Sequence, residues 1–319
     1  NCSNSSTVIG KNNDSSAGGV CGNNNGTVRD CKNTGSVSGQ NDVGGVCGFN
    51  AGTVKSCYNT GSVHGTGTHV GGVCGSNYIV TTYSGTITNC YYLENTATGG
   101  MEGKDVPGKA EKISKEHFES GEVAWLLNGK GLGEQVWGQQ LGIDPSPVPG
   151  SAYKVIKAAQ GDKDANDHYT YWATFSNLKN DVTLSVPSES GRTLNVYNAT
   201  VSGGKMTLTE RNNQVAKEEG VLLKTDGEYV NAKANKTTEL EKASSDLVAT
   251  PAEAQTVTAE TGYRLYRLTY KNDTNKEGLG FYLGVDKANN SYDGTRLKAT
   301  PGKAYLKVSE NEAKDPSSA

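Results

Sequence analysis

The sequence predicts an all-β protein: a short three-sided β-solenoid of about three 26-residue coils, a small helical cap, and a C-terminal antiparallel β-sandwich. Three observations lead to this fold class. A glycine-rich block recurs at fixed spacing in the first third of the chain, short Val- and Thr-rich segments alternate with turn residues, and only one stretch has the apolar periodicity of a helix. The 41 glycines among 319 residues also suit strands and turns better than helices.

The recurring block is Gly-Gly-Val-Cys-Gly, followed about ten residues later by a second cysteine, with a stretched third copy. It begins at Gly18, Gly44 and Gly71, so the starts lie 26 and 27 residues apart. Such similarity is typical of stacked repeats, in which each unit buries its apolar face against its neighbours. Within one period, three Val- and Thr-rich segments are separated by glycine-containing corners. This pattern predicts three strands per coil, with coils about 4.8 Å apart.

Stacking places equivalent residues of successive coils in ladders. The predicted ladders are Cys21, Cys47 and Cys74; Cys31, Cys57 and Cys90, with Cys2 at the open end; and Val20, Val46 and Val73. Seven cysteines invite disulfides, but the count is odd, and side chains that point the same way suit the torsion of a disulfide poorly. We therefore expect small buried hydrophobes with free thiols. Zinc is the alternative, which the absence of any Cys-x-x-Cys pair disfavours.

Residues 44–63 resemble the GLUG repeat of bacterial surface proteins. They read Gly-Gly-Val-Cys-Gly-Phe-Asn-Ala-Gly-Thr-Val-Lys-Ser-Cys-Tyr-Asn-Thr-Gly-Ser-Val. That family usually reads Gly-Gly-Leu/Ile-Val-Gly-x-Asn-x-Gly-x-Ile-x-Asn-Cys-Tyr, so this chain has cysteine where an aliphatic residue is common. The match covers residues 1 to about 95. The resemblance implies a secreted or surface location with an adhesive or architectural role, and it brings no catalytic residues.

The segment after the repeats is expected to cover the open end of the last coil. Residues 96–143 form this capping segment, with one helix at about 114–128 that Ser114 caps and Asn128-Gly129 ends. An uncovered coil would expose its apolar interior, so we expect the following residues to form the cap: Trp125, Leu126, Leu127 and Trp137. The alternative is a sugar-binding platform made by the two tryptophans. Residues 121–142 also resemble a segment that often follows GLUG repeats.

Residues 144–150 contain three prolines and predict a stiff linker to a β-sandwich at 151–319. Short strands separated by polar turns suggest the sandwich. The expected strands are 153–159, 169–175, 182–186, 193–199, 205–210, 220–224, 263–270, 280–285 and 304–308, with 235–260 as a long surface connection. Six motifs within 153–309 resemble a C-terminal β domain of surface proteins from gut and oral anaerobes. They are residues 171–175, 194–199, 206–210, 220–224, 279–282 and 302–306.

Charge and hydropathy exclude two classes of partner. The net charge is −3, which gives no electrostatic basis for binding nucleic acid, and no run of 18 apolar residues could span a membrane. Asn1 lies part-way through a repeat, so we expect an exported chain whose signal peptide and earlier coils lie outside this sequence. We expect a monomer in the extracellular space or on the cell surface, with a host matrix protein or glycan as its possible partner.

Catalytic and metal-binding patterns are sparse. The four histidines, His64, His69, His117 and His168, form neither a metal-binding pair nor part of a nucleophile elbow. No catalytic residue and no cofactor are therefore expected. The alternative is calcium, for which two oxygen-rich segments are candidates: Asp162, Asp164, Asn166 and His168; and Asp286, Asn289, Asn290, Asp293 and Gly294. Neither completes an EF-hand loop, and solvated hairpin turns explain both.

Three functions remain open from the sequence. The first is a non-enzymatic surface protein, in which a solenoid stalk carries a β-sandwich for adhesion or surface architecture. The second is a carbohydrate-binding accessory module, for which an exposed Trp or Tyr on one face of the sandwich would be the sign. The third is a polysaccharide-active enzyme, because β-helices also host such enzymes. Three coils rich in Ser, Thr, Asn and Gly offer few catalytic side chains for the third.

Overall fold

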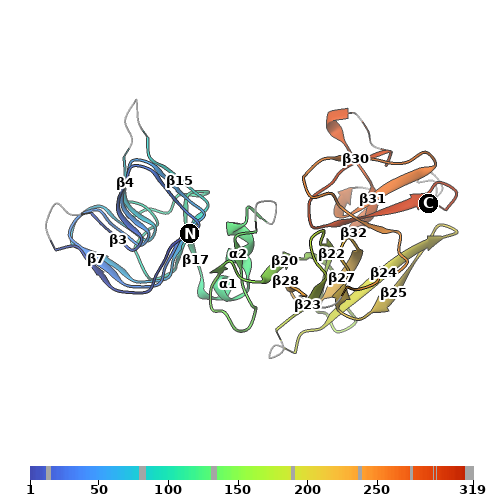
Figure 1. Cartoon of the computed structure of the whole chain (residues 1–319), viewed down its shortest axis with the longest axis horizontal. Coiled ribbons are helices and arrows are strands. Elements are labelled where there is room, and N and C mark those ends of the chain that lie inside the picture. Colours follow the sequence, from blue (N-terminus) through green and yellow to red (C-terminus); the bar gives the residue numbers. More distant parts are fainter. Residues whose placement is uncertain are drawn as a thin grey trace. The chain divides into compact units, whose positions relative to one another are not determined.

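The structure is a computed structural model of the whole chain. It describes residues 1–11, 16–78, 84–130, 135–187, 191–235, 239–273, 276–289, 291 and 293–312. The fold is nearly all β, with 50% strand and 5% helix, which confirms the predicted class. The chain forms two compact units, Asn1–Ser151 and Ala152–Ala319 (Figure 1).

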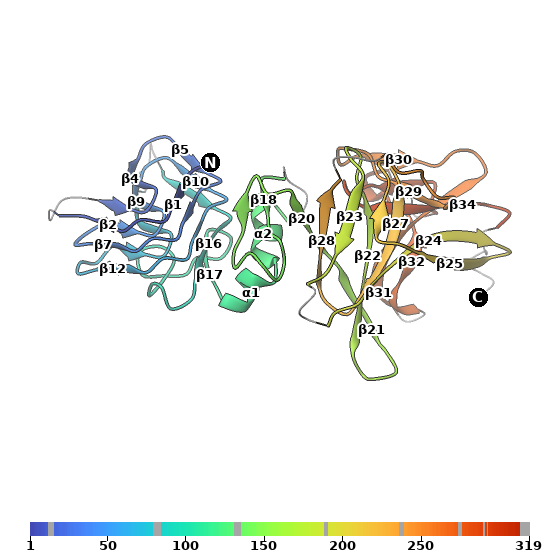
Figure 2. The same cartoon turned by 60° about the horizontal axis from the view of Figure 1, so that its bottom comes forward.

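The first unit is a β-solenoid whose coils pair through five parallel ladders (Figure 2). Successive coils are in register, so that Val54 lies between Val28 and Ile87. The ladders are β1 (Ser3–Asn4), β6 (Lys32–Asn33), β11 (Tyr58–Asn59), β16 (Cys90–Leu93) and β17 (Ala110–Ile113); β5 (Thr27–Arg29), β10 (Thr53–Lys55) and β15 (Thr86–Thr88); β2 (Val8–Ile9), β7 (Val37–Gly39) and β12 (Val63–Gly65); β3 (Ala17–Gly18), β8 (Val43–Gly44) and β13 (Val70–Gly71); and β4 (Cys21–Asn24), β9 (Cys47–Asn50) and β14 (Cys74–Asn77).

Each complete coil thus has five short strands where the sequence predicts three. The Gly44-Gly45 pair divides one predicted segment into β8 and β9, and the turn after Asn59 separates β11 from β12. A Cβ atom added to Gly45 would lie 2.0 Å from the carbonyl oxygen of Gly72. Only glycine therefore allows the next coil to approach this closely.

The stack continues past residue 95, where the sequence predicts its end. The amide of Gly72 donates to the carbonyl of Gly99 at 2.7 Å, and that of Val73 donates to Gly100 at 2.9 Å. Strand β17 then pairs with β16, with Ala110 opposite Cys90. The backbone donors of the third complete coil need buried acceptors, and a partial fourth coil supplies them.

The helix expected at 114–128 is instead two short helices, α1 (Lys115–Glu119) and α2 (Glu122–Leu127). The prediction of one helix is wrong because Gly121 adopts a left-handed conformation, with φ 94°, that interrupts the helical backbone. Ser114 caps α1 as predicted, since its side chain accepts a hydrogen bond from the backbone N–H of His117. Asn128 lies at the C-cap of α2.

The Pro-rich segment 144–150, which the sequence suggests is a linker, packs on the first unit instead. Strand β19 (Val148–Pro149) pairs antiparallel with β18 (Trp137–Gly138). The Tyr58 hydroxyl donates to the carbonyl of Pro147 at 2.6 Å, while its oxygen lies 3.0 Å from the Ser146 hydroxyl. Tyr58 is fully buried, so its hydroxyl needs a partner inside the protein, and the segment provides one.

The second unit is built from three main antiparallel sheets and one two-stranded ribbon. Sheet one is β20 (Tyr153–Lys157), β28 (Tyr229–Ala234), β23 (Val182–Ser185) and β26 (Gln214–Val215). Sheet two is β21 (Ala159–Lys163), β22 (Tyr169–Ser176), β27 (Gly220–Thr225), β24 (Leu194–Ser202) and β25 (Lys205–Arg211). Sheet three is β29 (Leu247–Ala249), β34 (Ala304–Ser309), β31 (Tyr263–Asp273) and β32 (Lys276–Leu283). The ribbon is β30 (Thr256–Thr258) and β33 (Arg296–Lys298).

The predicted sandwich is confirmed, and sheet two is its central layer (Figure 2). Val221 and Leu223 of β27 share an apolar core with Leu184 of sheet one. Leu222, between them, packs in a different core with Leu306 of sheet three. A strand with both faces covered reads as a continuous apolar run, as the Gly-Val-Leu-Leu sequence of β27 does.

The region 235–260 is not simply a surface connection, which corrects the sequence prediction. Within its described part, β29 pairs with β34, and Leu247 is only 4% exposed. Strand β30 pairs with β33. Strands β29 and β30 have three residues each, which is too short for an alternating pattern to stand out in the sequence.

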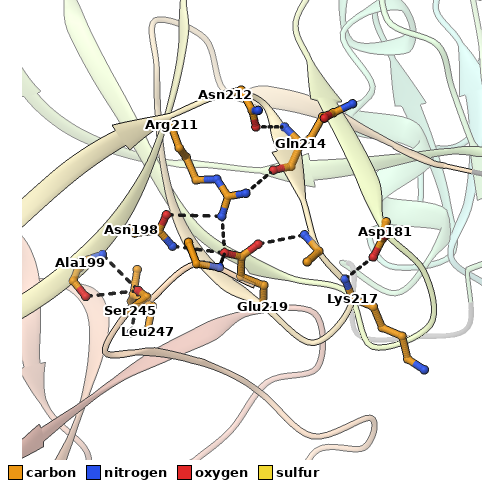
Figure 3. Close-up of polar contacts among 12 residues, drawn as sticks. Asp181, Asn198, Ala199, Arg211, Asn212, Gln214, Lys217, Glu219, Ser245 and Leu247 are labelled. Carbon is orange, nitrogen blue, oxygen red and sulfur yellow. Dashed lines mark hydrogen bonds and ion pairs between the residues drawn. The ribbon is translucent and has the colours of Figure 1, made fainter. Parts of the chain in front are cut away.

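A buried carboxylate and a serine hydroxyl hold this region in place where strand pairing is short (Figure 3). Glu219, 3% exposed, forms an ion pair with Arg211 and accepts backbone N–H bonds from Ala216 at 2.9 Å and from Ala243 at 3.0 Å. Ser245 similarly bonds both backbone groups of Ala199. Because protein groups occupy both oxygens of Glu219, this carboxylate is a structural anchor.

Candidate functional site

The interior of the solenoid is occupied by side chains that bond to one another. In one ladder, the Nδ2 of Asn24 donates to the Oδ1 of Asn50, whose Nδ2 donates to the Oδ1 of Asn77, both at 2.7 Å. In a second ladder, Asn33 accepts from Asn4 and donates to Asn59, both at 2.8 Å. Sequence reasoning missed these ladders, although Asn-x-Gly recurs at these positions in successive coils.

The cysteines line the same interior. Cys47 lies opposite Cys21 and Cys74 in the strand register. Each of these three thiols donates to the carbonyl two residues ahead, at 3.1–3.2 Å. In the other series, Cys31, Cys57 and Cys90 donate to the carbonyl two residues behind, also at 3.1–3.2 Å, and the residue before each cysteine has φ between 52° and 55°. The thiols therefore satisfy carbonyl groups at the corners, which an aliphatic side chain cannot do.

All seven cysteines are free thiols. The hydrogen bond with Cys47, together with burial, raises the pKa of Cys74 well above its ordinary value, and burial also raises the pKa of Cys21. These thiols stay protonated at neutral pH, so they are poor nucleophiles and poor metal ligands. Among the described residues, no group of three or more His, Cys, Asp and Glu side chains is placed to hold a metal ion.

The valine ladder follows the same stacking. The amide of Val20 donates to the carbonyl of Val46 at 3.0 Å, and that of Val46 donates to Val73 at 2.9 Å. Val46 and Val73 are fully buried, whereas Val20, in the first coil, is partly exposed.

The residues proposed as a cap differ in their surroundings. Leu127 and Trp137 belong to an apolar cluster with Tyr58 and Phe118, and Leu126 packs against it. Trp125 is half-buried and lies outside that cluster. Trp137 has no exposed surface and its ring lies 5.3 Å from that of Tyr58, so it cannot form a platform for a sugar. The sequence reasoning missed Phe118, which packs on nearby Leu127 and on Tyr58 from a distant segment.

The histidines lie apart in polar surroundings. The Nδ1 of His69 lies 3.0 Å from a carboxylate oxygen of Asp42 in the neighbouring coil, and His64 is exposed. His117 contacts the Ser114 hydroxyl at the start of α1, and the backbone of His168 donates to Asp164. None of these contacts places a histidine beside a cysteine.

One acid in each of the two calcium candidates, Asp164 and Asp293, caps its own turn. Asp164 accepts backbone N–H bonds from His168 and Asn166, and these bonds lower the pKa of its carboxyl. In the second segment, Asn290 lies outside the described residues. Asp293 accepts from the hydroxyl and the backbone N–H of Thr295, which lower the pKa of its carboxyl to about 2. The turn geometry alone explains both acids.

A cavity of about 290 Å³ in the second unit is lined mainly by sheets two and three and by the β30–β33 ribbon, and we call it the cationic pocket. Its lining combines cationic side chains, hydroxyl groups and small apolar residues. The lining residues are Lys157, Ala159, Trp172, Ala173, Thr174, Thr250, Arg267, Leu268, Thr269, Leu297, Lys298, Ala299, Thr300, Lys303, Ala304 and Tyr305. Four of them carry a cationic side chain, and none of these residues is Asp, Glu, His or Cys.

The positive charge of the pocket is only partly compensated. Lys157 forms an ion pair with Glu228 at 2.8 Å. In the described part of the chain, no carboxylate forms an ion pair with Arg267, Lys298 or Lys303. Arg267 and Lys298 are exposed, whereas Lys303 is half-buried and donates to the carbonyl of Lys157 at 3.4 Å. Burial and, to a smaller extent, the charge of Lys154 lower the pKa of Lys303 to about 8.

The turn that carries Lys303 is firmly held. The Thr250 hydroxyl donates to the carbonyls of Thr300 at 2.8 Å and of Lys303 at 2.9 Å. The Ser176 hydroxyl also donates to the Lys303 carbonyl. Gly302 has φ 73°, and a Cβ atom there would lie 2.8 Å from the Nζ of Lys154. The left-handed backbone conformation favours glycine at this position, whereas the Nζ of Lys154 is the end of a flexible side chain that can shift.

The sequence gives no signal for this pocket, because its lining comes from six strands and their turns spread over residues 157 to 305. What the arrangement offers chemically is positive charge with hydroxyl groups nearby. Such a lining favours binding an anion, and it lacks the carboxylate or imidazole that general acid–base catalysis most often uses.

No protein-family model matches the chain, and neither the curated proteins nor the solved structures contain a significant match. Among the described residues, no helix is long and apolar enough to cross a membrane.

Proposed function

We propose that this chain is a non-enzymatic protein of the bacterial cell surface or the extracellular space, of the GLUG-repeat kind. In this proposal the solenoid is a stalk, and the second unit is the module that displays or binds. Adhesion or surface architecture is the role, and a host matrix protein or a glycan is the partner. The repeat resemblance of residues 44–63 supports the location.

One contrast between the two units supports an architectural role for the solenoid and a binding role for the second unit. The described interior positions of the solenoid are filled by bonded asparagines, corner thiols and packed valines. Arg267, Lys298 and Lys303, by contrast, line a cavity of the second unit and have no carboxylate partner among the described residues. Interior side chains that already have hydrogen-bond partners favour an architectural role for the solenoid. Cationic side chains that line a cavity without an anionic partner favour binding of a ligand there.

The second candidate is a carbohydrate-binding accessory module of a polysaccharide-utilising surface protein. The cationic pocket and the presence of Trp172 in its lining favour it. Less favoured is a polysaccharide-active enzyme, because the pocket lining has no carboxylate pair of the kind that glycoside hydrolysis uses.

A single experiment separates these candidates. Beads coated with the full chain are allowed to settle on immobilised matrix proteins and on neutral and acidic polysaccharides, with and without calcium, and retention is measured under flow. The same polysaccharides are assayed for new reducing ends and for unsaturated products. We expect saturable retention without turnover. Turnover of any polysaccharide would overturn the proposal of a non-enzymatic role, and absence of retention on every surface would overturn the proposal of an adhesive one.

A further inference from the structure

We propose that the cationic pocket of the second unit binds an acidic sugar residue of a glycan, through the carboxylate or sulfate group of that sugar. This inference rests on the proposed binding role of the second unit and names the ligand class for it. Three features of the pocket support it: its charge, its size and the hydroxyl groups of its lining.

The charge of the pocket stands out against that of the whole chain. The chain has a net charge of −3, yet four cationic side chains line this one cavity. Of these, Lys157 already has Glu228 as its partner. Arg267, Lys298 and Lys303 form no ion pair within the described part of the chain, and Lys303 lies in the field of a further cation, Lys154. Like charges gathered without counter-ions are costly, and a bound anion would relieve that cost.

Arg267 and Lys303 offer different kinds of contact to an anion. The guanidinium of Arg267 presents paired N–H donors that match the two oxygens of a carboxylate or two oxygens of a sulfate. The ammonium of Lys303 is a compact charge on a turn that Thr250 and Ser176 hold in place. Because the backbone of this turn is already fixed, only the side chain of Lys303 loses conformational freedom when an anion binds.

The size and lining of the pocket favour a sugar over a larger anion. A cavity of about 290 Å³ lies near the lower end of the range for small-molecule sites, so it suits one ring rather than an extended chain. Threonine hydroxyls lie beside apolar surface from residues such as Leu268 and Leu297. A pyranose presents the same combination, with hydroxyl groups around a ring that has apolar faces.

The test uses the full chain and three probes: D-galacturonate, D-galactose 6-sulfate and uncharged D-galactose. Binding is measured by isothermal titration calorimetry at low ionic strength, with ligand-observed NMR as a second readout for weak binding. We expect saturable binding of at least one acidic sugar and none of galactose at the same concentration. Which acidic sugar binds distinguishes a uronate from a sulfated residue.

The pocket is then altered at its two exposed cations, Arg267→Gln and Lys298→Gln, which leaves the buried packing intact. The matched control removes two exposed lysines that do not line the pocket, Lys205→Gln and Lys287→Gln, so that the change in net charge is the same. We expect the pocket variant to bind the acidic sugar about tenfold more weakly or worse, as loss of a charge-assisted hydrogen bond would predict. The control should bind as the wild type does.

Two results would overturn this inference. One is binding of an acidic sugar that is equally strong in the pocket variant and the control. The other is no binding of either acidic sugar by the wild-type chain. If coated beads still adhere to a glycan or matrix protein in those cases, the proposed adhesive function survives and only the assignment of the pocket is wrong. If the beads adhere to no surface, the proposed function itself is wrong.

Discussion

Asn33 and Asn59 lie in adjacent coils of the solenoid, and the side-chain Nδ2 of Asn33 donates to the Oδ1 of Asn59 at 2.8 Å. Both residues are fully buried. The Oδ1 of Asn59 also accepts from the backbone N–H of Gly61, and its Nδ2 donates to the carbonyl of the same glycine. One side chain thus closes its own turn and binds the preceding coil, which couples the local fold to the stacking.

Replacing Asn59 by Ala should therefore destabilise the first unit by about 2–3 kcal/mol, because buried polar groups of Asn33 and Gly61 lose their partners. The measurement is urea unfolding followed by circular dichroism. The matched control is Asn25→Ala, since Asn25 is exposed. Its unfolding free energy should stay within about 0.5 kcal/mol of the wild type. Equal losses in the two variants would contradict the role of the ladder.

Gly26 and Gly52 hold equivalent positions in successive coils but have different surroundings. A Cβ atom at Gly52 would lie 2.1 Å from the carbonyl oxygen of Gly26, whereas one at Gly26 would meet nothing within 4 Å. We expect Gly52→Ala to destabilise the first unit by about 3 kcal/mol, because two coils must separate to admit the methyl group. Gly26→Ala should be nearly neutral. Thermal unfolding of both variants tests the stacking, and a neutral Gly52→Ala would refute it.

The thiols should differ sharply in reactivity. Cys2 is exposed and Cys21 partly exposed, while the other five cysteines are buried. At pH 8, a chromogenic disulfide reagent should react rapidly with Cys2, more slowly with Cys21, and with the remaining five only in denaturant. Mass spectrometry of the labelled peptides identifies the sites. Rapid labelling of Cys47 or Cys57 in the native chain would mean that the coils do not close around them.

Lys303 should make the stability of the second unit depend on pH. Burial lowers the pKa of Lys303 in the folded chain to about 8, below its ordinary value near 10.5. The folded state therefore disfavours the charged form. This penalty is complete below pH 8 and disappears as the pH rises toward the unfolded value. Relative to Lys303→Met, the wild-type chain should gain about 2 kcal/mol of unfolding free energy between pH 7.5 and 10.

Urea unfolding at several pH values measures this difference. Lys205→Met serves as the control, because Lys205 is exposed. The difference between that variant and the wild type should not change over the same range. A flat difference for Lys303→Met would show that its ammonium is well solvated in the folded chain. Saturation with an acidic sugar should reduce the pH dependence, because a bound anion stabilises the charged form.

The solenoid could be predicted from sequence because its signal is repetition. The spacing of Gly18, Gly44 and Gly71 indicates the length of a coil before any contact is known. The asparagine ladders were equally visible as Asn-x-Gly in successive coils, yet composition alone marks such residues as turn formers. The partial fourth coil, which ends in β17, keeps only the Gly99-Gly100 part of the repeat. Its place in the stack is therefore visible only from the backbone pairing in the structure.

For the second unit, the positions of most strands could be predicted from the sequence, but the packing of the sheets into layers could not. The nine expected strands correspond to β20, β22, β23, β24, β25, β27, β31, β32 and β34. The continuous apolar run of β27 indicated burial on both faces, but nothing local shows which sheet covers each face. The cationic pocket is harder still, because Lys157 and Lys303 are 146 residues apart in the sequence and meet only through sheet packing.

The central claim is that the second unit binds the ligand and the solenoid does not. The most direct test measures which of the two units, when altered in the full chain, loses binding. Wild-type protein and two variants with equal charge change are passed over an immobilised acidic polysaccharide. One variant alters the pocket, Arg267→Gln with Lys298→Gln, and the other alters exposed cations of the solenoid, Lys11→Gln with Lys55→Gln. If the second unit binds and the solenoid is its stalk, only the pocket variant should lose affinity, by about tenfold or more. Loss in the solenoid variant with full binding by the pocket variant would contradict that account.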